Sequence, residues 1–223
     1  MGWGGVALAL LLPLLAARSA EAIIYADNLS QTNVGNSGIG DFGISLSAGS
    51  SFTTGNDSYS LNSVTASFSE SAEGDLNINL YSNAGSEPGT LLESLSTTDD
   101  ITGSPSNHLF EPNNLVTLDP TTTYWLIGES ASGQYAWNVT NSTAETAIDG
   151  WTIGDGGVFS TNGGASWSPG NSSTVQFNVD ATAASVPFEF SPGLGLLLMT
   201  GLFGGKVAYS KYRTRKIELE DIS

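Results

Sequence analysis

The chemistry open to this chain is limited first by its few reactive side chains. It has no cysteine and a single histidine, His108. Catalysis by a serine or threonine needs a base beside the hydroxyl, and no Gly-x-Ser-x-Gly turn surrounds any serine. We therefore expect His108 to be an exposed strand residue and the protein not to be an enzyme. The lack of cysteine also excludes thiol catalysis and cysteine-ligated metal sites.

Carboxylates are abundant, since 22 of the 223 residues are Asp or Glu. Two carboxylates are enough for a glycosidase, so a carboxylate-based glycan hydrolase stays open as an alternative. Ca²⁺ prefers oxygen ligands, which loops at 56–57, 99–100 and 149–155 could supply. None of them has the spacing of an EF-hand or a nonapeptide repeat. We expect solvated turns there and assign no metal ligand, with Ca²⁺ kept as an optional cofactor.

Tryptophans beside glycine-rich loops are the candidate binding residues. An exposed indole offers a flat apolar face on which a sugar ring can stack. Trp151 and Trp167 lie beside such loops, and we expect them to be exposed and available for glycan stacking. Trp125 and Trp137 have strand-like neighbours, so we expect them in the core.

The elements that must position these residues are β-strands. In Leu76–Leu80, apolar and polar residues alternate, as in a half-buried strand. No long segment of helical period occurs between 23 and 185, and turn-forming residues, including Pro88-Gly89, separate the strands. We predict an all-β fold, a β-sandwich of the jelly-roll type. The expected strands are 59–69, 76–80, 115–118, 124–128, 135–139 and 175–179.

Charge is distributed unevenly along the chain, whose formal net charge is −16. All six Lys and Arg residues lie outside 23–185, at Arg18 and from Lys206 onward. A domain without cationic side chains cannot neutralise phosphates, so nucleic-acid binding is excluded. The remaining partners for such a surface are neutral polysaccharides or polysaccharides bridged by Ca²⁺.

The N-terminus has the features of a signal peptide, residues 1–22. An apolar segment, Val6–Ala17, precedes Ala20 and Ala22, which form an A-x-A cleavage site. Cleavage there would start the mature domain at Ile23. The segment before the apolar core lacks Lys and Arg, so an uncleaved anchor or a misassigned start stays open.

The C-terminal segment, 186–216, has the composition of a single transmembrane helix with a basic flank. Phe190–Tyr209 has the roughly 20 residues that a span requires. Lys206 can extend to the interface, and the basic residues after it favour a cytoplasmic position. The pattern predicts a membrane anchor, an extracytoplasmic domain at 23–185 and a short acidic cytoplasmic tail at 217–223.

A short motif precedes this span: Pro187, Phe188, Glu189, Phe190, Ser191 and Pro192. The order of motif, span and basic cluster resembles the PEP-CTERM sorting signal, in a Pro-Phe-Glu variant of the cyanobacterial type. The resemblance implies processing by an exosortase-type enzyme. The tail at 217–223 extends past the point where such signals usually stop, so the segment could be cleaved or retained.

Five phrases of the domain carry a resemblance: Tyr59–Val64, Leu80–Asn83, Pro88–Leu92, Leu118–Leu126 and Tyr135–Trp137. They resemble the choice-of-anchor R domain, a bacterial surface module. The resemblance covers most of 52–151 and implies an exported, anchored, β-rich protein without transferable catalytic residues. We expect a structural or adhesive role at the cell surface or in the extracellular matrix. A carbohydrate-binding module or a glycan hydrolase is the alternative.

Overall fold

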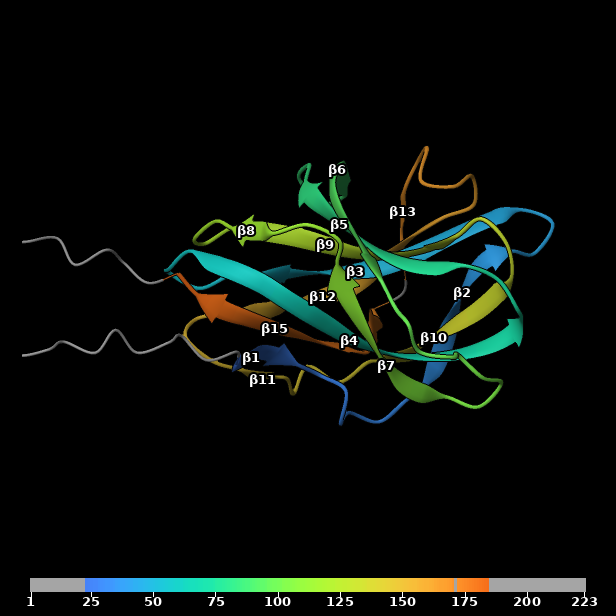
Figure 1. Cartoon of the computed structure of the whole chain (residues 1–223), viewed down its shortest axis with the longest axis horizontal. Coiled ribbons are helices and arrows are strands. Elements are labelled where there is room, and N and C mark those ends of the chain that lie inside the picture. Colours follow the sequence, from blue (N-terminus) through green and yellow to red (C-terminus); the bar gives the residue numbers. More distant parts are fainter. Residues whose placement is uncertain (1–22, 171, 185–223) are drawn as a thin grey trace, which may run out of the picture. The chain divides into compact units, whose positions relative to one another are not determined.

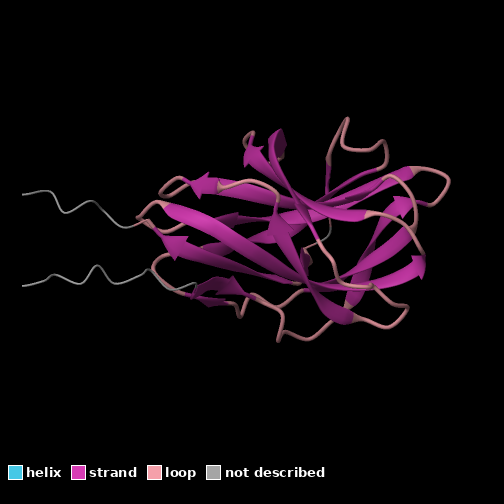
Figure 2. Ribbon diagram, viewed as in Figure 1, coloured by secondary structure: helices cyan, strands magenta, loops and turns pink. Residues whose placement is uncertain are grey.

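The computed structural model describes residues 23–170 and 172–184, which form an all-β fold (Figure 1). Figure 2 shows strands joined by loops throughout this part of the chain. The predicted signal peptide with Ala20 and Ala22, the sorting motif at 187–192, the membrane segment and the acidic tail lie outside the described residues. Among the residues described, no helix is long and apolar enough to cross a membrane.

Fifteen strands make up this fold. They are β1 (Ile23–Asp27), β2 (Gly35–Asp41), β3 (Ser45–Thr53), β4 (Tyr59–Ala72), β5 (Leu76–Asn83), β6 (Pro88–Ser96), β7 (Ser106–Pro112), β8 (Val116–Leu118), β9 (Thr123–Ser130), β10 (Gln134–Thr140), β11 (Thr146–Ala147), β12 (Thr152–Ser160), β13 (Ser168–Pro169), β14 (Thr174–Val175) and β15 (Phe177–Ala183).

Eight of the strands close into a ring of antiparallel neighbours, in the order β4–β7–β6–β5–β9–β3–β2–β10 and back to β4. The all-β prediction is thereby confirmed. The ring is therefore a closed β-barrel of antiparallel strands with extra strands attached. Two of its pairings are short: Gly40 and Asp41 of β2 pair with β3, and Leu95 and Ser96 of β6 pair with β7. The remaining strands attach to the ring, with β15 beside β4, β1 beside β15 and β12 beside β3.

The interior of the ring holds the main hydrophobic core, and alternation along the strands fills it. On β5, Ile78 and Leu80 are fully buried inside, while Asn79 and Tyr81 belong to the opposite face. That opposite face of β5 and β9 carries, together with Val158 of β12, a separate group of side chains outside the ring. The inner face of the ring is thus filled by the main core, and a binding site must lie on the outer face.

Two local predictions differ from the structure. The expected turn at Pro88-Gly89 is wrong, because the turn lies just before it: Ala84 N donates to Glu87 O at 2.9 Å, and Pro88 begins β6. The expected strand at 175–179 is interrupted at Gln176, which separates β14 from β15. Gln176 N donates to Asn138 O at 2.8 Å, and Gln176 O accepts from the Trp137 indole at 2.9 Å.

Candidate functional site

Trp151 is a core residue and offers no face to a ligand. Its exposed fraction is 2%. The indole stacks on Phe52 with ring centroids 5.5 Å apart and on Tyr25 at 5.1 Å, and Tyr59 meets it edge-on at 4.9 Å. The prediction that Trp151 is exposed for glycan stacking is therefore wrong. Residues distant in sequence, on β1, β3 and β4, supply the aromatic rings that cover it.

Trp167 lies on the outside of the ring and is half-buried. It meets the Tyr81 ring edge-on, with centroids 6.4 Å apart. The two rings pack against a small buried group outside the main core, formed by Trp125, Ile127 and Val158. We call these five residues the outer cluster. Trp167 thus stays a candidate stacking residue, and the structure adds Tyr81 and Trp125 beside it.

The hairpin between β12 and β13 places Trp167 over this face. Ser166 N donates to Asn162 Oδ1 at 3.0 Å, and Gly164 N donates to Ser160 Oγ at 2.9 Å. Gly163 and Gly164 have φ angles of 64° and 81°, which suit glycine and bend the loop back onto the sheet. A Cβ at Gly164 would lie 3.4 Å from a Trp167 ring carbon, so the loop packs closely against the indole.

Trp125 and Trp137 are both buried, as predicted, but on opposite faces. Trp137 is fully buried in the main core. Trp125, 7% exposed, lines a groove of about 410 Å³ on the outside of the ring, which we call the outer groove. The β5–β6 turn contributes one set of lining residues and β12 with β13 the other, on the side of the domain where Figure 1 places β6 and β13. Its lining includes Ser51, Asn83, Glu87, Thr123, Asp155 and Pro169.

The chemistry of the outer groove suits an uncharged, hydroxyl-rich ligand. Its floor contains the edge of an indole, whose Nε1 donates to Asn83 Oδ1 at 2.9 Å. Glycines of β12 leave backbone groups at the surface, and Ser51 and Thr123 add hydroxyls. An apolar surface with a few convergent polar groups is the usual form of a small-molecule site. The two carboxylates on its rim, Glu87 and Asp155, are both exposed.

A polar group borders the outer cluster. Tyr81 OH donates to Glu129 Oε1 at 3.1 Å, and Asn79 Nδ2 donates to Glu129 Oε2 at 2.7 Å. Burial and the neighbouring Glu129 carboxylate raise the pKa of Tyr81 to about 12. Asn79 is 8% exposed, and its Oδ1 has no hydrogen-bond partner. The phenol is therefore neutral at physiological pH and acts as a hydrogen-bond donor.

The loops considered for Ca²⁺ do not converge on a metal site. Within 23–170 and 172–184, no three His, Asp or Glu side chains are grouped so that they could hold a metal ion. Asp99 and Asp100 line a hollow of about 440 Å³ together with Glu70, Glu73 and Asp75. This acidic hollow concentrates negative charge at one place on the surface.

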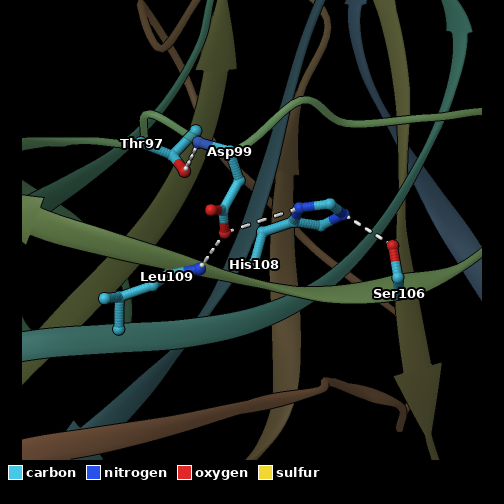
Figure 3. A network of polar contacts seen from close by, with 5 residues as sticks. All are labelled: Thr97, Asp99, Ser106, His108 and Leu109. Carbon is cyan, nitrogen blue, oxygen red and sulfur yellow. Dashed lines mark hydrogen bonds and ion pairs between the residues drawn. The ribbon is translucent and has the colours of Figure 1, made fainter.

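His108 is buried, so the prediction that it is exposed is wrong, as it is for Trp151. It lies on a strand, as expected, but is 5% exposed. Its Nε2 lies 2.8 Å from the Ser106 hydroxyl, and its Nδ1 lies 3.8 Å from Asp99 Oδ2 (Figure 3). A serine, a histidine and an aspartate thus lie in series. The only sequence signal for this was the spacing of Ser106 and His108, which puts both side chains on one face of a strand.

Comparison with known proteins adds no relative. No protein-family model matches the chain, and no curated protein is significantly similar to it.

Proposed function

We propose that this chain is an exported surface protein whose β domain has a structural or adhesive role outside the cytoplasm. It is anchored in the membrane by its C-terminal segment or released to the cell surface or extracellular matrix by an exosortase-type enzyme. Within this proposal the domain is a relative of the choice-of-anchor R modules, and its ring of strands is a jelly-roll sandwich closed at its sides. The support is the arrangement of signal-like, β-rich and anchor-like segments along the sequence.

The observation that supports the adhesive role is the outer groove, which lies on a domain without Lys or Arg. No Lys or Arg lies in 23–184, so the groove has no cationic clamp for phosphate, sulfate or carboxylate. Neutral sugars need only an apolar face and hydrogen-bonding groups, and Trp125, Asn83 and Thr123 supply these. The ligand is therefore a neutral glycan, or a polysaccharide that Ca²⁺ bridges to the acidic rim.

The experiment is a glycan array with the full chain in detergent micelles, with and without Ca²⁺. We expect binding to neutral glycans, weakened about tenfold or more by Asn83→Ala, since that change removes the partner of the Trp125 indole. Phe42→Ala is the control, because Phe42 is exposed (44%) like Asn83 but lies outside the outer groove. Strong calcium-independent binding to sulfated or uronic glycans would contradict the proposal.

Export is tested by protease treatment of intact and osmotically shocked cells that express the full chain. An extracytoplasmic domain is digested when the envelope is opened, while a cytoplasmic marker stays intact. A domain protected as a soluble cytoplasmic species would overturn the localisation.

Processing is tested separately in a host with an exosortase. Replacement of Pro187 to Pro192 by Gly and Ser residues should prevent cleavage, so the mature mass should increase by that of the retained segment. An unchanged mass with the segment present in both proteins would leave it as an anchor alone.

A glycan hydrolase is the second candidate, favoured by one observation. Glu87 and Asp155 line the outer groove from different elements, and glycosidases use two carboxylates flanking the sugar. Glu87→Gln and Asp155→Asn would then abolish cleavage of a bound polysaccharide while leaving its binding in place. Release of no reducing ends from any glycan that binds would leave the adhesive role.

A further inference from the structure

The imidazole of His108 lies between the exposed hydroxyl of Ser106 and the carboxylate of Asp99. Glycan binding in the outer groove does not involve this group. Ser106 and His108 are two residues apart on β7, so their side chains lie on the same face of the strand. Ser106 is exposed, whereas His108 is buried behind it. Figure 3 shows the imidazole between the Ser106 hydroxyl and the Asp99 carboxylate. A solvent-borne molecule can therefore reach the hydroxyl but not displace the base.

The carboxylate is held in place by the backbone. Asp99 Oδ2 accepts from Leu109 N at 2.9 Å, and Asp99 N donates to Thr97 Oγ1 at 3.0 Å. The carboxylate faces Nδ1 of His108 at 3.8 Å and so favours the tautomer with its proton on Nδ1. In that tautomer Nε2 carries a lone pair and accepts from the Ser106 hydroxyl, 2.8 Å away. This distance is within the range in which a general base takes a proton.

We propose that Ser106 is a nucleophile that accepts an acyl group from an uncharged carboxylic ester, with His108 as its general base and Asp99 as a positioning residue. A nucleophile bonded to a base that a third group orients is the arrangement that activates a serine. The acidic side chains around Asp99, including Asp100 and Glu70, oppose anionic substrates. A neutral ester is therefore the substrate class.

The reaction needs only Ser106, His108, the ester and water. Ser106 Oγ bonds to the ester carbonyl carbon as its proton moves to Nε2 of His108. The tetrahedral intermediate then breaks its bond to the alkoxy oxygen, and the alcohol leaves with the proton from Nε2. Water, deprotonated by His108, attacks the acyl-serine and releases the carboxylic acid with Ser106 restored. No oxidant, reductant or metal takes part.

If the hydrogen bond between Ser106 and His108 had only a structural role, its loss would change the stability of the protein but not the reactivity of Ser106. Labelling of the serine separates the two cases. The full chain in detergent micelles is treated with a fluorophosphonate probe, and adducts are located by peptide mass spectrometry. We expect one adduct, on Ser106, absent from Ser106→Ala, which removes only an exposed hydroxyl. His108→Gln should slow labelling by about 10²-fold or more, the usual contribution of a general base. Asp99→Asn should slow it by less.

Ser168→Ala is the matched control, because Ser168 is exposed on a strand without an imidazole at hydrogen-bond distance in the part of the chain described. It should leave the labelling of Ser106 unchanged. Labelling of the native protein no faster than that of the urea-unfolded chain would overturn the proposal, and this comparison needs no variant to fold. Labelling that His108→Gln leaves intact would also overturn it. Neither result bears on glycan binding, which involves the outer groove.

Discussion

Trp151 and Trp167 have similar neighbours in the sequence and opposite positions in the fold. Each lies next to glycines and a turn, yet Trp151 is 2% exposed and Trp167 is half-buried outside the ring. The difference comes from partners far along the chain. Tyr25, Phe52 and Tyr59 surround Trp151, whereas Trp167 meets the Tyr81 ring edge-on and packs against the rest of the small outer cluster. Local composition therefore locates a loop, and long-range strand pairing decides which of its residues are covered.

Removal of the buried Trp151 indole should have the largest effect on stability. Trp151→Ala leaves a cavity among three aromatic rings, and such changes lower the free energy of unfolding by about 3–5 kcal/mol. Urea denaturation of the full chain in micelles, followed by the fluorescence of the remaining tryptophans, measures the loss. A loss below about 1 kcal/mol would mean that Trp151 is not a core residue.

Trp167→Ala should have a smaller effect on stability. Its ring is half-buried and makes one edge-on aromatic contact, worth about 0.5–1.5 kcal/mol beyond the area it covers. We expect the free energy of unfolding to fall by about 1–2 kcal/mol in the same assay. A loss as large as that of Trp151→Ala would show that the outer cluster is a second core and not a surface feature.

The contrast between local sequence and long-range strand pairing explains which features of the fold and the site could be predicted from the sequence. Alternation in Leu76–Leu80 and Tyr135–Val139 located β5 and β10, because a period of two depends on local residues alone. Closure of the ring depends on a few distant pairs, such as Trp137 with Phe68, and no local pattern encodes them. His108 was missed for the same reason, since Asp99 reaches it from a loop outside its strand.

Tyr81, in the outer cluster, should make the stability of the protein depend on pH in the alkaline range. Its pKa is raised to about 12, so the folded protein keeps a proton that the unfolded chain loses at about pH 10. Stability from this group is complete below pH 10 and is lost as pH rises towards 12. Tyr81→Phe should lower stability by about 1 kcal/mol at pH 7, through the lost bond to Glu129. It should also make the decline between pH 9 and 11 less steep.

Tyr25, beside Trp151, gives a second test of the same effect, and exposed Leu115 gives the control. Burial also raises its pKa, and Tyr59 adds to the effect. Tyr25→Phe should therefore flatten the same decline, while Leu115→Ala, at an 84% exposed position, should not. Urea denaturation at pH 7, 9 and 11 compares the variants. Equal slopes in all of them would refute the linkage to buried tyrosines.

The smallest expected effect concerns a carboxylate near Trp151. Glu145 Oε2 accepts from Ile153 N at 2.7 Å and so fixes the start of β12, two residues after the indole. Burial raises the pKa of Glu145, which the bond from Ile153 partly offsets and the nearby Asp155 charge reinforces. The folded state thus favours the neutral form more than the unfolded chain does. Its contribution to stability is complete below about pH 4.3 and is lost as pH rises through the folded pKa.

Glu145→Gln keeps an acceptor for Ile153 N and removes the charge that burial disfavours. We expect the variant to match or exceed the parent at pH 7, by less than about 1 kcal/mol, and to lose the fall in stability above about pH 4.3 that Glu145 contributes. Glu87→Gln makes the same chemical change on an exposed turn and should alter neither quantity. Because Glu145 lies on the segment that leads to Trp151, a destabilised Glu145→Gln would show that the charge itself holds this segment. The burial of Trp151 would then depend on electrostatics as well as on the aromatic rings around it.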